Sequence, residues 1–279
     1  MTDAWEEIIS AEPEEERVWE LFHENSKTHR FSDAPDDTQV AEAMLEFWED
    51  LPYAGTDAVR LPGIAVPPVS LDKAILERRT DTKFGAAPIS LRDLSSLLTG
   101  GYGTTERPSA VGNRRFRTVP SAGALYPLEL YVHVRAVTEL DPGLYHFQAS
   151  AGLLQRLRLR ALLDQQFADA FVQPDVMGSA AVVILITAVF QRTTFKYGER
   201  GYRFTLIEAG HVAQNIDLIA SALDLPAANL GGFFDRELEA LLDIDGVEQS
   251  LVYAVAIGSN PARLGQTTPS MQNTDRRTT

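Results

Sequence analysis

The sequence lacks cysteine: none of its 279 residues is a cysteine. Disulfide bonds, thiolate catalysis and iron–sulfur clusters are therefore excluded for this chain. The five histidines also lack the spacing of a zinc or iron motif, so we expect no metal site.

Positive charge is scarce as well. The net charge is −14, and only four of the 25 basic residues are lysines, namely Lys27, Lys73, Lys83 and Lys196. Nucleic-acid binding depends largely on dense basic side chains that replace the counterions of phosphate groups. We therefore expect no nucleic-acid partner.

Long apolar runs are also missing. The longest, Ala180 to Phe190, is well short of the roughly 18–20 residues that a membrane-spanning helix needs. The first residues, MTDAWEEIISAEPEEE, are acidic, whereas a secretory signal begins with positive charge. We therefore expect a cytoplasmic protein with no membrane partner.

Changes in composition suggest three parts. Residues 1–70 form a helical N-terminal extension that ends in a Pro/Gly-rich, irregular linker from Leu51 to Ser70. Residues 71–262 form the main domain, and the polar residues 263–279 are expected to be a disordered tail.

Within the main domain, hydrophobic periodicity predicts both helices and strands. Ser90 is typical of an N-cap, and Gly100 and Gly101 are expected to end its helix. The turn Asp141-Pro142-Gly143 favours a hairpin. The expected strands are 128–135, 143–147, 180–190 and 251–257, and the other expected helices are 162–171, 203–223 and 235–242. The fold class is therefore α+β, with a small, mostly antiparallel sheet surrounded by helices.

Two local clusters suit the binding of a phosphorylated, flat ligand. Arg78, Arg79 and Thr80 offer two guanidinium groups and a hydroxyl, which are good donors to a phosphate. The alternative is an ordinary solvated arginine pair. The segment PSAGALYPLEL, beginning at Pro120, has small residues that let the backbone approach a flat ligand, and Gly123 frees the chain from the usual φ limits. The alternative is a tight loop that leads into a strand.

Two further clusters follow. In FKYGERGYRF, Lys196 and Tyr197 are adjacent proton-transfer groups on an expected loop, although a solvated lysine beside a packing tyrosine would have the same sequence. In NLGGFFD, Gly231 and Gly232 could turn backbone N–H groups towards a ligand, or could form a plain turn.

In this order, the four clusters resemble the SagB-type dehydrogenases of the FMN-dependent nitroreductase superfamily. The resemblance runs from about Leu71 to Gly258, and its most specific strings are PSAGALYPLE and KYGERGYRF…EAGHVAQN. One departure is Thr82, which stands where the family has a basic residue; Lys83 is next to it.

The resemblance implies a nitroreductase-like fold and a homodimer with two FMN sites at the subunit interface. It implies that the FMN phosphate lies near Arg78, Arg79 and Thr80, with Arg263 returning to it after the last strand. It places Pro120, Ser121, Ala122 and the neighbouring Gly123 of the partner subunit against the isoalloxazine ring. It places the backbone N–H of Gly232 at the flavin N5, with Gly231 beside it.

The resemblance also implies an activity. Azoline dehydrogenases of this family are similar in carrying a Lys-Tyr pair, which Lys196 and Tyr197 match. The implied reaction oxidises a peptide thiazoline or oxazoline to the azole, with hydride transfer to flavin N5, and the implied partners are a cyclodehydratase and a peptide substrate. Two alternatives stay open: an NAD(P)H-dependent nitro or quinone reductase on the same fold, and a non-catalytic scaffold of a peptide-modifying complex.

Overall fold

The structure is a computed structural model that describes residues 17–28, 30, 35–53, 55–108, 115–157 and 164–261. Its centre is one seven-stranded sheet in the order β1-β6-β5-β4-β7-β9-β8, and every neighbouring pair is antiparallel. The strands are β1 (Ala58–Arg60), β4 (Leu128–Val134), β5 (Gly143–Gln148), β6 (Leu153–Arg156), β7 (Val182–Val189), β8 (Ala227–Leu230) and β9 (Gln249–Ile257). A separate ribbon pairs β2 (Thr104–Pro108) with β3 (Arg115–Arg117).

The middle of the sheet follows directly from the sequence pattern. Both faces of β7 are apolar. Consecutive residues such as Ile184 and Leu185 therefore enter separate hydrophobic clusters on opposite sides of the sheet. The predicted hairpin at Asp141-Pro142-Gly143 is confirmed as the connection between β4 and β5. The sheet is larger than predicted, because β1, β6 and β8 are short strands with little periodicity of their own.

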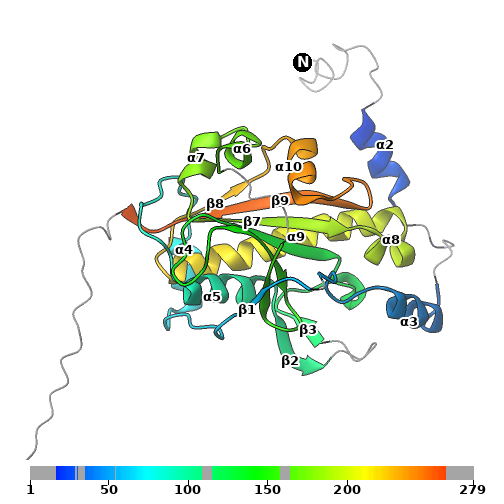
Figure 1. The fold of residues 1–279 in the computed structure, drawn as a ribbon. Coiled ribbons are helices and arrows are strands. Elements are labelled where there is room, and N and C mark those ends of the chain that lie inside the picture. The colour runs from blue at the N-terminus through cyan, green and yellow to red at the C-terminus, as the bar shows by residue number, and fades with distance from the viewer. Residues whose placement is uncertain are drawn as a thin grey trace, which may run out of the picture.

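Helices cover both faces of the sheet (Figure 1). On one face lie α5 (Leu91–Tyr102) and the long α9 (Glu199–Ala222); on the other lie α6 (Asp164–Asp169), α7 (Pro174–Ser179) and α10 (Asp235–Leu242). This arrangement confirms the α+β class. No helix in the described ranges is both long enough and apolar enough to cross a membrane.

The predicted end of α5 is wrong. A capping box of Ser90 and Asp93 starts the helix as expected, but the helix continues through Gly100 and Gly101 to Tyr102. A Cβ atom at Gly101 would lie 2.7 Å from Cγ1 of Ile216 on α9. The two glycines therefore allow α5 and α9 to pack closely rather than ending the helix.

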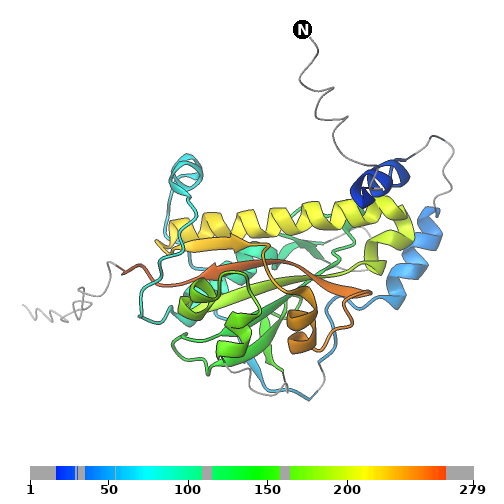
Figure 2. The ribbon, with the colours of Figure 1, turned by 90° about the horizontal axis from the view of Figure 1, so that it is seen from above.

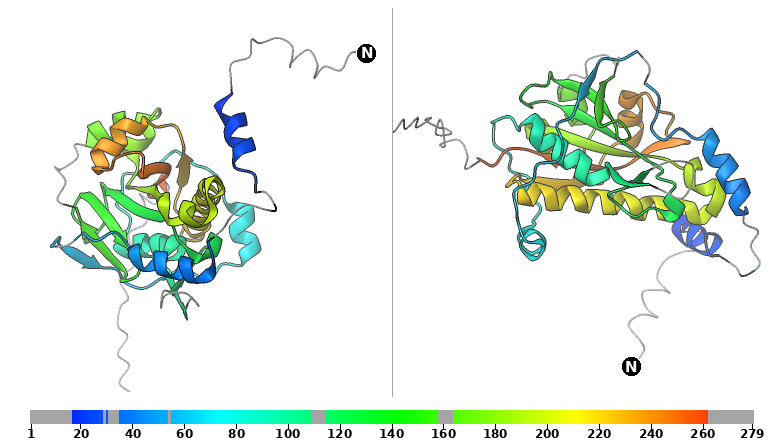
Figure 3. Two further views of the ribbon diagram at one scale, coloured as in Figure 1. Left: turned by 90° about the vertical axis from the view of Figure 1, so that its right-hand side faces the viewer. Right: turned by 90° about the horizontal axis from the view of Figure 1, so that it is seen from below.

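The N-terminal part contains α2 (Val18–Asn25), α3 (Asp37–Glu46) and α4 (Leu71–Glu77). α2 and α3 lie at the end of the molecule that carries the start of α9 (Figures 1 and 3). Residues 58–60, inside the expected irregular linker, form the edge strand β1. α4 projects away from the body beside the other end of α9 (Figure 2).

Candidate functional site

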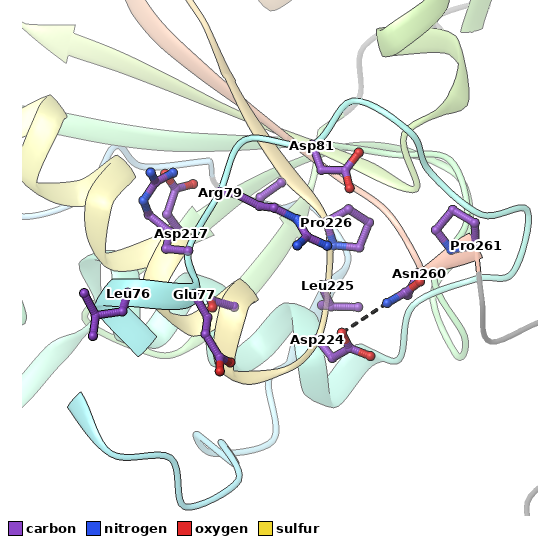
Figure 4. A pocket seen from close by; sticks show the side chains of 13 residues that line it. Leu76, Glu77, Arg79, Asp81, Asp217, Asp224, Leu225, Pro226, Asn260 and Pro261 are labelled. Carbon is purple, nitrogen blue, oxygen red and sulfur yellow. Dashed lines mark hydrogen bonds and ion pairs between the residues drawn. The ribbon is translucent and has the colours of Figure 1, made fainter. Parts of the chain in front are cut away.

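Arg78 and Arg79 line a pocket of about 550 Å³ at the C-terminal end of α9 (Figure 4). We call it the Arg78 pocket. Arg78 directly follows α4, and the opposite wall is made by Asp217 and Ser221 of α9 together with Pro226 and other residues of the turn after that helix. The predicted arginine pair therefore faces a concave surface rather than open solvent.

Asp217 gives the Arg78 pocket an unusual charge pattern. Its side chain is buried, lies 4.0 Å from an Arg78 guanidinium nitrogen, and accepts a hydrogen bond of 2.7 Å from the Asn229 amide. Burial raises the pKa of Asp217, although the Asn229 hydrogen bond and the Arg78 charge counteract this effect. The Oδ1 atoms of Asp217 and Asn229 are both buried and have no protein donor among the described residues. Of the two residues, Asp217 lines the Arg78 pocket, so its Oδ1 is an acceptor at the pocket wall without a partner in the described ranges.

Strand β8 connects the Arg78 pocket to the predicted glycine pair. Thr80 forms a parallel bridge with Ala227, the first residue of β8, and Gly231 and Gly232 follow its last residue. Gly231 lines a second pocket of about 440 Å³, which we call the Gly231 pocket, together with Tyr202 and Leu206 of α9. Arginines and glycines that are about 150 positions apart in the sequence are thus joined along one short strand.

Gly123 and the predicted catalytic pair are in contact. Gly123 lies in the short 3-10 turn η1 (Ala122–Ala124), where its φ of 62° is in the left-handed region. A Cβ atom at Gly123 would be 2.8 Å from the Tyr197 hydroxyl and 3.4 Å from the Lys196 ammonium group. A Cβ atom here would therefore displace the Tyr197 hydroxyl or the turn, and the positive φ also favours glycine.

Lys196 and Tyr197 are not on a loop as predicted but form the end of helix α8 (Gln191–Tyr197). α8 is fixed to the sheet by the buried Arg192, which pairs with Glu129 of β4 at 2.7 Å. Burial alone would raise the pKa of Glu129, but Arg192 and a hydrogen bond from His146 lower it to about 2. A fully charged ion pair thus holds the helix one turn before Lys196.

The two groups of residues lie on opposite sides of α9. Leu206, in the Gly231 pocket, and Asp217, in the Arg78 pocket, are eleven positions apart, so they lie within about 20° of each other around the helix. Phe204, which contacts the Tyr197 ring with 5.2 Å between ring centroids, is about 160° from Leu206. We call the first side the arginine–glycine side and the second the lysine–tyrosine side.

Sequence reasoning missed Glu208, Asp217 and Asn229. Glu208 lies on the lysine–tyrosine side, is 2% exposed and accepts a 2.9 Å hydrogen bond from the Tyr102 hydroxyl. Glu208 and Asp217 are both buried residues of α9 and lie at the two opposite edges of its broad buried stripe, which includes Val212 and Ile216. A carboxylate in an apolar stripe was the available signal.

The remaining predicted residues are placed as follows. Pro120, Ser121 and Ala122 lead into and begin η1, so they lie on the lysine–tyrosine side. Arg263 lies outside the described residues. Among the residues that are described, no group of three or more His, Cys, Asp or Glu side chains is arranged to hold a metal ion.

Comparison with known proteins gives three findings. MJ1384, a protein of Methanocaldococcus jannaschii named for the nitroreductases, is 36% identical over 189 residues, which are 68% of this chain and 91% of that protein. The microcin B17-processing protein McbC of Escherichia coli is 26% identical over 166 residues, which are 56% of this chain and only 57% of McbC. The solved E. coli microcin synthetase McbBCD complex with truncated pro-MccB17 bound contains a chain of the same fold, with a TM-score of 0.55 and 20% identity over 87% of this chain and 92% of that one.

The sequence profile of the nitroreductase family matches residues 75–259, which include both sides of α9. This range begins in α4 and ends just after β9, so it contains every predicted site residue except Arg263. The profile match and the archaeal relative together show that the chain belongs to the nitroreductase family.

Proposed function

We propose that this nitroreductase-family oxidoreductase is an FMN-dependent dehydrogenase that oxidises thiazoline or oxazoline rings of a peptide to azoles, and that it works as a homodimer. The observation that carries the proposal is the contact of Lys196 and Tyr197 with Gly123 of the PSAGALYPLE segment. This segment and the one that contains Lys196 and Tyr197 are the parts of the sequence that most specifically resemble the SagB-type dehydrogenases.

The residues of the arginine–glycine side fit FMN. Arg78 and Arg79 offer charge-assisted donors that suit a phosphate. The buried, unsatisfied Oδ1 atom of Asp217, which lines the same pocket, is an acceptor that suits a hydroxyl of a ribityl chain. Gly231 and Gly232 would allow the flavin ring to approach the backbone. When bound, FMN supplies the two-electron acceptor for the reaction.

Two chains are needed because the catalytic pair and the cofactor residues lie on opposite sides of α9. We propose that the lysine–tyrosine side of one subunit completes the arginine–glycine side of the other. Large apolar side chains stand exposed on α4 and α9, where a second copy could cover them. They are Leu71 (69% exposed), Ile75 (51%), Leu76 (81%), Leu206 (41%) and Ile207 (55%).

In the proposed reaction the azoline ring loses two hydrogens. One leaves its α-carbon as a proton, and Lys196 accepts that proton as a general base while Tyr197 relays it or holds the ring nitrogen. The other would leave the adjacent ring carbon as hydride, which FMN held by the arginine–glycine side would accept, so that a double bond forms between the two carbons. Arg192 and Glu129 keep α8 in place, so the Lys196 and Tyr197 side chains do not have to be ordered when substrate binds.

The peptide context of the proposal is supported by a relative. McbC is named a microcin B17-processing protein, and its match to this chain covers 57% of its own length. We extend the proposal to a cyclodehydratase as the partner that supplies azoline-containing peptide, since the azoline must be made before it can be oxidised.

The test uses the purified protein, FMN and a synthetic thiazoline peptide, with the loss of two hydrogens followed by mass spectrometry. Lys196→Ala should bind FMN normally and lose about 10²- to 10⁴-fold in turnover, which is the usual contribution of a general base. Lys27→Ala, which removes an exposed lysine paired with Glu24, is the matched control and should keep its activity.

Three outcomes would overturn the proposal. Wild-type turnover by Lys196→Ala would remove the catalytic role of the pair. Rapid flavin reduction by NAD(P)H with no turnover of the peptide would favour a nitro or quinone reductase instead. A colourless protein that rejects added FMN would favour a scaffold.

A further inference from the structure

Glu208 is a buried carboxylate that connects to the lysine–tyrosine side through Ser121. It is 2% exposed and accepts a 2.9 Å hydrogen bond from the Tyr102 hydroxyl. The Ser121 hydroxyl also favours its ionised form. A buried carboxylate needs donors to be stable as an anion, and these two hydroxyls supply them.

Ser121 in turn fixes the shape of the turn that follows it. Its Oγ accepts a 2.9 Å hydrogen bond from the backbone N–H of Tyr126, so the hydroxyl hydrogen is available for Glu208. The backbone N–H of Ala124 also donates to the Ser121 carbonyl oxygen, at 3.1 Å. Gly123, between these anchors, is the residue that meets Tyr197 and Lys196.

These contacts form a closed ring. From Glu208 the ring runs through Ser121 to Gly123, then to Tyr197, whose ring contacts Phe204. Phe204 is one helical turn before Glu208 on the same side of α9. A change at Glu208 therefore reaches the Lys-Tyr pair by two routes, one through the turn and one along the helix.

We propose that Glu208 is a positioning residue for the Lys196–Tyr197 pair: its ionised carboxylate holds the Ser121 hydroxyl and thereby fixes the turn that presents Gly123 to both side chains. The role of the pair rests on the proposed function. The link between Glu208 and the turn does not, because it involves neither the reaction nor the cofactor.

The surroundings of Glu208 make this link sensitive to pH. Burial raises its pKa to about 7, against the lowering effects of the Ser121 and Tyr102 hydrogen bonds and of the Arg117 charge. The titratable groups that face it are Tyr102 on α5, Arg117 on β3 and Tyr126 after η1. Above about pH 7 the carboxylate receives charge-assisted bonds; below it the protonated group offers Ser121 only a weaker, neutral one.

The test follows hydrogen–deuterium exchange at the Tyr126 amide, which donates to Ser121, in the full chain with and without FMN. After correction for intrinsic rates, exchange should slow about five-fold as pH rises from about 5 to about 9, with a midpoint near 7. Glu208→Gln, which cannot ionise, should remove this pH dependence. In turnover assays it should also remove a limb of the kcat profile near pH 7.

Two variants serve as checks. Ser121→Ala keeps the charge of Glu208 but cuts its link to the turn, so the pH dependence should vanish there too. Glu239→Gln removes another buried glutamate that accepts a serine hydroxyl, from Ser250 at 2.6 Å on the far side of the sheet. It should leave exchange at Tyr126 unchanged.

The inference and the proposed function fail in different ways. The positioning role is overturned if the corrected exchange rate of the Tyr126 amide in the wild type does not change near neutral pH, or changes equally in Glu208→Gln. This holds whatever the turnover of Lys196→Ala. If Lys196→Ala retains full turnover while amide exchange at Tyr126 still changes with pH, the proposed reaction is wrong but the link from Glu208 to the turn stands.

Discussion

The two sides of α9 are built in opposite ways. The arginine–glycine side has two pockets, exposed apolar residues and buried oxygen atoms without donors in the described part of the chain. On the lysine–tyrosine side, the polar groups already have partners: Arg192 is paired with Glu129, and Glu208 receives two hydroxyls. One side is open to a ligand, whereas the other is ordered in advance.

This difference has a physical reason. A site that binds a cofactor must exchange protein–water contacts for protein–ligand contacts, so its donors and acceptors have to be available beforehand. A proton-transfer pair gains most from being held in place before substrate arrives. In the proposed dimer each active centre would take its open half from one chain and its ordered half from the other.

The largest expected effect comes from mixing two inactive variants. Arg78→Ala should lose FMN, and Lys196→Ala should lose turnover. If the two sides of one centre come from different chains, half of all dimers in an equal mixture are mixed, and each mixed dimer has one intact and one doubly changed centre. Mixing equal amounts should then restore about a quarter of wild-type turnover, measured at an FMN concentration that saturates only the wild type.

The matched control mixes Lys196→Ala with Tyr197→Phe. Both changes lie on the lysine–tyrosine side, so every centre of a mixed dimer carries one of them and no recovery is expected. Recovery in this control, or none in the first mixture, would contradict a centre shared between chains.

The sequence predicts those helices and strands around the two sides of α9 that have a clear hydrophobic periodicity. β4, β7, β9 and most of α9 follow from alternating or helical hydrophobic patterns, and all four are present in the structure. Short β1 and β8 have too few residues for a pattern, although β8 joins the two pockets. Such strands are defined by partners that are distant in sequence.

Two predictions about helix boundaries are wrong, for different reasons. Gly100 and Gly101 indicated a helix end, but they serve close helix packing inside α5. The loop expected at Lys196 and Tyr197 is instead a helix that ends at Gly198, whose φ of 54° separates α8 from α9. Glycine permits a break in a helix but does not require one.

The contacts of the candidate site were least predictable. Ser121 and Glu208 are 87 positions apart, and the pattern of neither segment indicates the other. The resemblance to a family supplied the Lys-Tyr pair and the arginines, whereas the carboxylates that accompany them emerged only from the packing of α9 against η1 and β8.

The next largest effect is expected at Gly123. Gly123→Ala places a Cβ atom 2.8 Å from the Tyr197 hydroxyl, so either the turn or the pair has to move. We expect kcat to fall at least about tenfold, because small misplacements of reacting groups are costly, with little change in FMN affinity. Steady-state kinetics and flavin titration separate these effects.

Gly152→Ala is the matched control. Gly152, in the turn between β5 and β6, has nearly the same φ, 64°, but no described atom lies within 4 Å of the point that its Cβ would occupy. Both variants should lose about 1 kcal/mol of unfolding free energy from backbone strain. Equal losses of kcat in the two would mean that strain, and not contact with Tyr197, causes the effect.

The smallest expected effect tests whether the arginine–glycine side binds the phosphate of FMN. Arg78→Lys keeps the positive charge in the Arg78 pocket but loses the planar fork that can bind two phosphate oxygens, so FMN should bind about five- to tenfold more weakly. Riboflavin, which has no phosphate, should bind equally to the variant and the wild type. Arg156→Lys, an exposed arginine paired with Asp141, should change neither affinity. An equal loss for riboflavin would show that Arg78 acts on the fold or the ring and not on the phosphate, and the open side of α9 would then need another anion-binding group.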